Sequence, residues 1–332
     1  MNDRHCNLPE NLGFIITYLH NNYILEKWIQ AIMIDKNATI NVKAIAIMMV
    51  LFGHLVGAKR TELSGAWEII ATCGVALFLF ISGYGLYKSF ESKGFQGFWV
   101  SKFKKIYVPF VIATFFVGGS RGFWGDRWSE MLETVLFLNL KLTVDGTMWY
   151  IYYIVIWYFA FYLIFSLLKT NLLRLMVLAA LSFVLFNIPE QLSDTYRIAI
   201  PLFRWHAFSF TIGVAVAMLK PIKRSWLLIL GCILFLIFSY LLSRYLFNRE
   251  LLVATVTISA PAIIFIVAAL NIHIKPLAFI GGLSYELYLF EGAFRWNTFS
   301  PDKFSSGVIF FLITLSCAYL LKVSLKNIKA LN

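Results

Sequence analysis

The chain has 332 residues, of which 60% are hydrophobic, 17% are aromatic and only 14% are charged. A soluble domain of this size does not need so much apolar surface, and repeated apolar runs of about 20 residues are long enough to cross a bilayer as helices. The net charge of +12 is therefore better explained by basic cytoplasmic loops than by nucleic-acid binding, so we expect an all-α integral membrane protein.

The N-terminal residues 1–37 are predicted to form a cytoplasmic or interfacial segment. Within them, residues 22–34 repeat apolar side chains such as Ile24, Trp28 and Ile32 at helical spacing, with polar side chains on the other face. This pattern favours a helix lying in the membrane interface, and a short partner helix in solution is the alternative. No basic region precedes a clean apolar core, so we expect no cleaved signal peptide.

About ten membrane spans are predicted within one domain, residues 38–325, followed by a cytoplasmic tail at 326–332. They lie near 42–58, 66–87, 106–120, 147–168, 172–189, 199–219, 225–243, 251–270, 277–297 and 304–324. The junctions alternate between strongly basic ones, such as 88–105, and ones of mixed sign, such as 121–145. Because Lys and Arg gather in cytoplasmic loops, this alternation places both termini in the cytoplasm.

Two ionisable residues mark the first span. Lys43 and His54 are separated by ten uncharged residues, so in a helix they lie roughly 16 Å apart along the axis and on nearly the same face. Ionisable groups inside membrane helices usually face a protein interior or a polar cavity. The alternative is that Lys43 is an interfacial anchor and His54 a packing residue.

The second span ends in a run of small and hydroxyl-bearing residues. Gly83 and Gly85 would permit close helix approach, and Ser82 would hydrogen-bond between helices. The basic segment that follows places Lys102 and Lys105 on one helical face, where they would bind either phosphate groups or anionic lipid headgroups. Trp149 and the tyrosines after it fit an aromatic belt at the membrane interface.

Two carboxylates, Glu286 and Glu291, lie inside the ninth apolar span. They are five residues apart and point about 140° away from each other on a helix, so each needs its own partner. His54, Lys43 and Arg295 are the candidates. Intramembrane glutamates are functional candidates by default, and a buried ion pair that fixes helix packing is the structural alternative.

No metal or nucleotide site is predicted. The four cysteines form neither a disulfide framework nor a CxxC pattern, and no histidine has metal-ligand spacing. There is no phosphate-binding P-loop and no dinucleotide-binding GxGxxG.

Taken in order, these motifs resemble those of the acyltransferase 3 family of bacterial membrane O-acyltransferases. The resemblance covers roughly residues 38–325 and rests on five motifs. They are Lys43-x10-His54, Phe78-Leu-Phe-Ile-Ser-Gly-Tyr-Gly-Leu86, the stretch from Phe98 through Lys102 and Lys105 to Pro109, Trp149-Tyr150, and Leu283-Ser-Tyr-Glu-Leu-Tyr-Leu289. The family usually has arginine where this chain has Lys43, Lys102 and Lys105, and often histidine where it has Glu291. Lysine keeps the charge but loses the bidentate geometry of arginine, which bears on donor affinity and identity.

The resemblance implies transfer of an acetyl or other acyl group from cytoplasmic acetyl-CoA to a hydroxyl of a glycan or lipid-linked saccharide, in the bacterial inner membrane. Acetyl-CoA would be a co-substrate, with no permanently bound cofactor, no nucleic-acid partner, and self-association left open. The implied site comprises His54 as general base, oriented by Glu291 or Glu286, with Lys43, Lys102 and Lys105 binding the donor. The candidates for contacting substrate or the oxyanion are Ser82, Tyr84, Trp149 and Tyr285.

Two other classes of function remain. A transporter or flippase of glycan or lipid precursors would use the same polar groups to line a path, and a structural subunit would use them for packing. Transporters often contain internal repeats and broken helices. This chain has one mid-span proline, Pro261, and no detectable repeat, which mildly disfavours transport.

Overall fold

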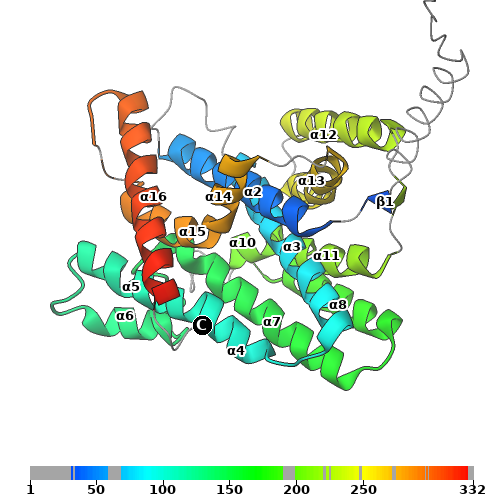
Figure 1. The fold of residues 1–332 in the computed structure, drawn as a ribbon, viewed down its shortest axis with the longest axis horizontal. Helices are drawn as coiled ribbons and strands as arrows, with labels where there is room; N and C mark the ends of the chain where they lie inside the picture. Colours follow the sequence, from blue (N-terminus) through cyan, green and yellow to red (C-terminus); the bar gives the residue numbers. More distant parts are fainter. Residues whose placement is uncertain are drawn as a thin grey trace, which may run out of the picture.

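The computed structural model describes residues 31–32, 34–58, 69–189, 199–219, 222–223, 226–246, 249–270, 274–295, 297 and 299–327, and these residues are mainly helical (Figure 1). The first helices are α2 (Lys36–Gly57), α3 (Ile69–Lys93), α4 (Phe98–Lys102), the π-helical turn η2 (Phe103–Tyr107), α5 (Val108–Ser120) and α6 (Trp128–Val135). Then follow the 3-10 turn η3 (Gly146–Met148), α7 (Trp149–Leu167), α8 (Asn171–Phe186), α10 (Ala199–Trp205) and α11 (Ser209–Met218). The last helices are α12 (Trp226–Leu246), α13 (Arg249–Leu270), α14 (Lys275–Gly282), α15 (Ser284–Phe294) and α16 (Lys303–Asn327).

The ten predicted spans all fall on described helices, two of them on helix pairs, α10 with α11 and α14 with α15. Four helices are long and apolar enough to cross a membrane, namely 36–57, 69–93, 146–167 and 303–327. Shorter apolar helices cover 171–186, 202–218, 227–239 and 255–270. The prediction of an all-α membrane protein is therefore supported by the apolar helices, whereas the number of ten spans stays a prediction.

The interfacial helix predicted over residues 22–34 lies mostly outside the described residues. Its described residues Ala31 and Ile32 form the strand β1, which pairs antiparallel with β2 (Ile222–Lys223). The helical prediction is wrong for these two residues, because their backbone pairs with a segment about 190 residues away in the sequence. Apolar periodicity within one segment cannot reveal such a partner.

Helix α2 occupies the middle of the helix assembly and packs against α3, α13, α14 and α15 (Figure 1). Asp35 caps its N-terminus by accepting a hydrogen bond from the Ala38 backbone N at 2.7 Å, which satisfies one of the unpaired N–H groups of the first turn. These neighbours bury about half of α2, while Met48 and Phe52 on its remaining face stay exposed. Lys43 and His54 are both partly buried, whereas Lys36 at the start of the helix is exposed.

Close backbone contact between α3 and α11 depends on a reciprocal pair of glycines. A Cβ atom at Gly83 would collide with the Phe210 carbonyl oxygen, and one at Gly213 would collide with the Phe80 carbonyl oxygen. Gly83 thus permits close approach as predicted. Gly85 does not, because no atom lies within 4 Å of its Cβ position, and the residue instead borders a cavity.

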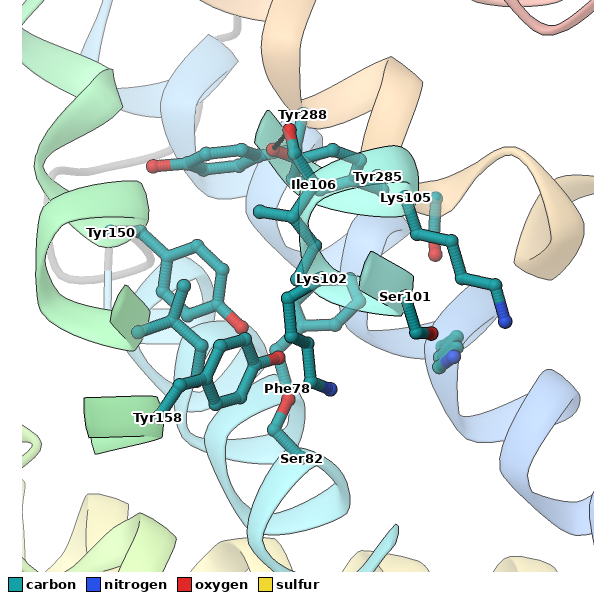
Figure 2. A pocket seen from close by; sticks show the side chains of 13 residues that line it. Phe78, Ser82, Ser101, Lys102, Lys105, Ile106, Tyr150, Tyr158, Tyr285 and Tyr288 are labelled. Atoms are coloured by element: carbon teal, nitrogen blue, oxygen red, sulfur yellow. Dashed lines mark hydrogen bonds between the residues drawn. The ribbon is translucent and has the colours of Figure 1, made fainter. Parts of the chain in front are cut away.

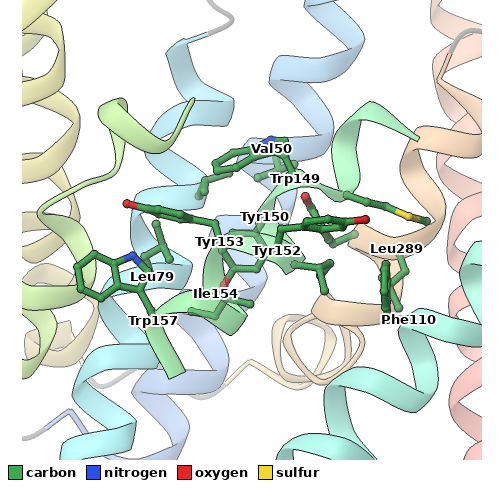
Figure 3. Packing of buried hydrophobic residues seen from close by; sticks show 14 of the residues in the cluster. Val50, Leu79, Phe110, Trp149, Tyr150, Tyr152, Tyr153, Ile154, Trp157 and Leu289 are labelled. Atoms are coloured by element: carbon green, nitrogen blue, oxygen red, sulfur yellow. The ribbon is translucent and has the colours of Figure 1, made fainter. Parts of the chain in front are cut away.

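Aromatic side chains of α7 fill the core (Figure 3). Trp157 and Tyr153 are fully buried, and the Trp157 ring stacks on Phe210 of α11 with centroids 4.9 Å apart. Trp149 and Tyr150 are also buried, at 7% and 8% exposure. The expectation of an interfacial aromatic belt at the start of α7 is therefore wrong, because these rings pack against neighbouring helices rather than facing headgroups.

Candidate active site

His54 and Glu291 meet between α2 and α15. His54 Nδ1 lies 2.9 Å from Glu291 Oε1, with the carboxylate completely buried and the imidazole side chain 24% exposed. The two groups are at ion-pair distance without the alignment of a hydrogen bond. Because a buried carboxylate needs a compensating partner, His54 is the described group that fills this place for Glu291.

The approach of α14 to α2 sets up this contact. A Cβ atom at Gly281 in α14 would collide with the Ile40 carbonyl oxygen, so only glycine allows the two helices to lie so close. Helix α14 ends at Gly282, and after Leu283 the chain forms α15, which also packs on α2. Glu291 is thereby carried alongside α2 to the level of His54, near the C-terminal end of α2.

Glu286 has a different partner from those considered in the sequence. Its Oε1 accepts a hydrogen bond from Lys322 Nζ of α16 at 2.6 Å, and the carboxylate is 4% exposed against 51% for the lysine. Glu286 therefore ties α15 to α16 and does not orient His54. This pair could not be predicted from the sequence, because Lys322 is one of several lysines at the end of the last span.

Three lysines predicted to bind the donor line one cavity of about 250 Å³, which we call the lysine cavity (Figure 2). Its lining residues are Lys43, Phe78, Ser82, Ser101, Lys102, Lys105, Ile106, Tyr150, Ile154, Tyr158, Ser284, Tyr285 and Tyr288. An adjoining lobe of about 320 Å³ shares the three lysines and extends past Ser89 to Lys93 and Gln96. Lys43 comes from α2, and Lys102 and Lys105, more than 50 residues later in the sequence, come from the α4–η2 segment.

The Lys102 ammonium lies over the ring of Tyr158, with Nζ 4.2 Å from the ring centroid. Burial, together with the neighbouring charges of Lys105, Lys43 and Lys93, lowers the pKa of Lys102 to about 8. The helix changes from α to π geometry directly after Lys102. Such π-helical turns are frequent at functional sites, and this one begins directly after Lys102 and contains Lys105.

The other predicted contact residues divide between several places. Ser82 and Tyr285 line the lysine cavity, and Tyr84 borders its adjoining lobe. Tyr285 already donates its hydroxyl to the Ile106 carbonyl oxygen at 2.9 Å. Trp149 lines neither lobe and instead stacks on His206, with ring centroids 5.5 Å apart.

Three tyrosines of the lysine cavity were not singled out from the sequence. Tyr150 and Tyr158 of α7 line the cavity together with Ser82, and Tyr288 donates its hydroxyl to the Thr147 carbonyl oxygen. The spacing of eight residues between Tyr150 and Tyr158 is about two helical turns, so it places both on one face of a helix. That spacing was the available signal, but α7 has so many aromatic residues that it did not stand out.

A second cavity, of about 240 Å³, lies beyond Glu291 along α15, and we call it the Asp145 cavity. It is lined by Ser120, Arg121, Asp145, Gly146, Ala293, Phe294, Arg295 and Asn297. From the sequence, Arg121 and Asp145 were only loop charges of mixed sign. Tyr288, three residues before Glu291, lines the lysine cavity, so the His54–Glu291 pair lies between the two cavities along α15.

Comparison of this chain with known proteins identifies its family. Neither the search of curated proteins nor the search of solved structures found a match. A family model described as an acyltransferase domain matches residues 37–323, a range that contains the two cavities and the His54–Glu291 pair. The match spans most of the chain, and the family implies membrane acyltransferase activity. The chain therefore belongs to the acyltransferase 3 family.

Proposed function

We propose that this protein is a membrane O-acetyltransferase that moves an acetyl group from cytoplasmic acetyl-CoA to a hydroxyl of an envelope polysaccharide or lipid-linked saccharide. The observation that carries the proposal is the contact of 2.9 Å between His54 Nδ1 and Glu291 Oε1, at the far side of Tyr288 from the lysine cavity. An imidazole paired with a buried carboxylate is the arrangement that activates hydroxyl nucleophiles in acyl transfer.

His54 acts as the general base. Glu291 only accepts hydrogen bonds when ionised, so the imidazole proton belongs on Nδ1 and the lone pair on Nε2, at the opposite edge of the ring. Nε2 takes the proton of the attacking hydroxyl as its oxygen bonds to the thioester carbonyl carbon. The carbon–sulfur bond of the tetrahedral intermediate then breaks, and the imidazolium returns the proton to the CoA thiolate.

The lysine cavity is the donor site in this proposal. Acetyl-CoA carries several phosphate charges at one end of a long chain, and three lysines line the cavity with no carboxylate among its lining residues. The tyrosine-rich wall, with Tyr150, Tyr158 and Tyr288, provides a mostly apolar passage for the pantetheine arm. The oxyanion requires donors, and the hydroxyl of Ser82 is better placed than that of Tyr285, which is engaged with Ile106.

The orientation of the chain decides whether the lysine cavity meets the cytoplasm. We propose that α4 and the turn before it face the cytoplasm, because Lys93, Lys102, Lys104 and Lys105 lie there. A membrane-impermeant maleimide should label Lys93→Cys only after the inner membrane is permeabilised. It should label Trp124→Cys while the inner membrane is still intact. Labelling of Lys93→Cys in intact cells would place the lysines outside and remove their access to cytoplasmic acetyl-CoA.

The reaction itself is tested with the full chain in proteoliposomes. Acetyl-CoA should release free thiol on addition of an envelope saccharide fraction, and mass spectrometry should find the saccharide heavier by one acetyl group. A transporter or flippase would move saccharide across the bilayer without thiol release. Mass spectrometry of surface glycans from a deletion strain then identifies the acceptor and its modified hydroxyl.

A further inference from the structure

Asp145 of the Asp145 cavity is held in one position by its surroundings. Its side chain is buried, with the residue 2% exposed, and Oδ1 accepts hydrogen bonds at 2.9 Å from both the backbone N and the hydroxyl of Thr147. On the α15 side it packs directly on Gly292, where a Cβ atom would collide with the carboxylate. The carboxyl group therefore has little freedom to turn.

Arg121 ties this loop to α15. Its Nη1 donates to the Val144 carbonyl oxygen and its Nη2 donates to the Gly292 carbonyl oxygen at 2.5 Å. The Arg121 guanidinium therefore binds backbone oxygens on both sides of Asp145. These hydrogen bonds hold Asp145 against Gly292, which is the residue next to Glu291 in α15.

The second oxygen of Asp145, Oδ2, has no hydrogen-bond partner among the described residues, although it is buried in the cavity lining. Leaving a buried acceptor unsatisfied costs about 1–3 kcal/mol, and more for a charged group. Burial raises the pKa of the Asp145 carboxyl, and the Arg121 charge opposes this shift only in part. A hydroxyl from a bound molecule would satisfy Oδ2.

The chemistry of the lining favours a neutral polyol over an ion. Asp145 opposes an anion, whereas Arg121 and Arg295 oppose a cation. The remaining polar groups are the Ser120 hydroxyl and the Asn297 amide, both suited to hydroxyl partners. Phe294 adds an aromatic ring that an apolar sugar face can cover.

The size of the cavity limits the ligand to one small unit. Its volume of about 240 Å³ lies below the range of about 300–1,000 Å³ found for drug-sized ligands. From these observations we propose that the Asp145 cavity is the acceptor site, in which one pyranose ring binds with a hydroxyl donated to Asp145 Oδ2. This inference rests on the proposed function, and it places the acceptor on the opposite side of Glu291 from the donor.

Binding is tested without relying on catalysis. Two single-cysteine probes report the two cavities, Ser120→Cys in the Asp145 cavity and Ser101→Cys in the lysine cavity, with the unmutated chain correcting for its native thiols. Alkylation by a maleimide is followed with the full chain in detergent. The ligands are the methyl pyranosides of glucose, galactose, rhamnose and N-acetylglucosamine, and acetyl-CoA.

We expect at least one methyl pyranoside to slow alkylation of Ser120→Cys and not of Ser101→Cys. Adding Asp145→Asn should raise the protecting concentration by about tenfold or more, since the amide presents an N–H₂ donor where a hydroxyl needs an acceptor. The proposal is overturned if no pyranoside protects Ser120→Cys, or if Asp145→Asn leaves protection unchanged. Failure of the donor proposal would be observed separately, because acetyl-CoA would then not slow the alkylation of Ser101→Cys.

Discussion

The two cavities that flank the His54–Glu291 pair differ in charge. The lysine cavity gathers three cations among its lining residues and no carboxylate, whereas the Asp145 cavity combines two arginines with one carboxylate. An excess of one sign suits a polyanionic ligand, and a mixture of both signs suits a neutral one. Under the proposed function, this difference corresponds to a donor side and an acceptor side, with His54 and Glu291 between them.

The cavities also differ in how the chain builds them. Side chains of the lysine cavity project from helices, including α2, α3, α7 and α15. The Asp145 cavity is built from helix ends and connections: the end of α5, the residues before α7 and the residues around the end of α15. If related enzymes share one donor, a donor site built from helices would be the same in all of them. A site built from connecting segments can vary more, which would allow different acceptors.

The largest effect is expected from the His54–Glu291 pair, which lies between the two cavities. His54→Gln keeps a hydrogen-bonding side chain but removes the base, so transfer should fall by about 10²–10⁴-fold while acetyl-CoA still protects Ser101→Cys from alkylation. Initial rates of thiol release measure this. His206→Gln is the matched control, because His206 is a buried histidine that lines neither cavity. Near-normal transfer by His54→Gln would make His54 structural.

A smaller effect is expected from the lysine cavity alone. Lys43→Ala should raise the acetyl-CoA KM by about tenfold to a hundredfold at nearly unchanged kcat, since a phosphate contact is equal in ground and transition states. Lys43→Arg keeps the charge and should bind acetyl-CoA nearly as well as the wild type. A fall in kcat at saturating acetyl-CoA with an unchanged KM would remove Lys43 from the donor site.

The pKa of Lys102 gives the donor side its own pH dependence. With a pKa of about 8, Lys102 is mainly charged at neutral pH and loses its proton as the pH rises. The acetyl-CoA KM should therefore rise between about pH 7 and 9, over the range in which the ammonium titrates. Lys102→Arg should flatten this rise because arginine stays charged. A KM that rises equally in Lys102→Arg would assign the effect to another group.

The smallest effect on transfer is expected from the packing contact between α3 and α11. Gly83→Ala forces a methyl group against the Phe210 carbonyl oxygen and should lower the unfolding free energy by about 1–3 kcal/mol. Gly85→Ala is its matched control two residues away, where no atom lies within 4 Å, and should raise stability by about 0.5–1 kcal/mol because alanine favours helix more than glycine. Thermal unfolding in detergent compares them, and equal midpoints would contradict the close α3–α11 contact.

Local sequence patterns were enough to predict the apolar helices, the position of Lys43 and His54 on one helix, and the family. These depend on the local order of residues, because hydrophobic length, helical spacing and motif order are all properties of short segments. They also marked Glu286 and Glu291 as unusual, since carboxylates inside apolar spans are rare.

The contacts between side chains of the site, by contrast, depend on the tertiary fold. It paired Glu291 with His54 and Glu286 with Lys322, moved Trp149 from the interface into the core, and brought Asp145 against Gly292. Each of these contacts joins segments far apart in the chain, and each depends on how closely two helices approach. That approach is set by packing at particular backbone positions, such as Gly281 against Ile40, which no periodicity within a single segment encodes.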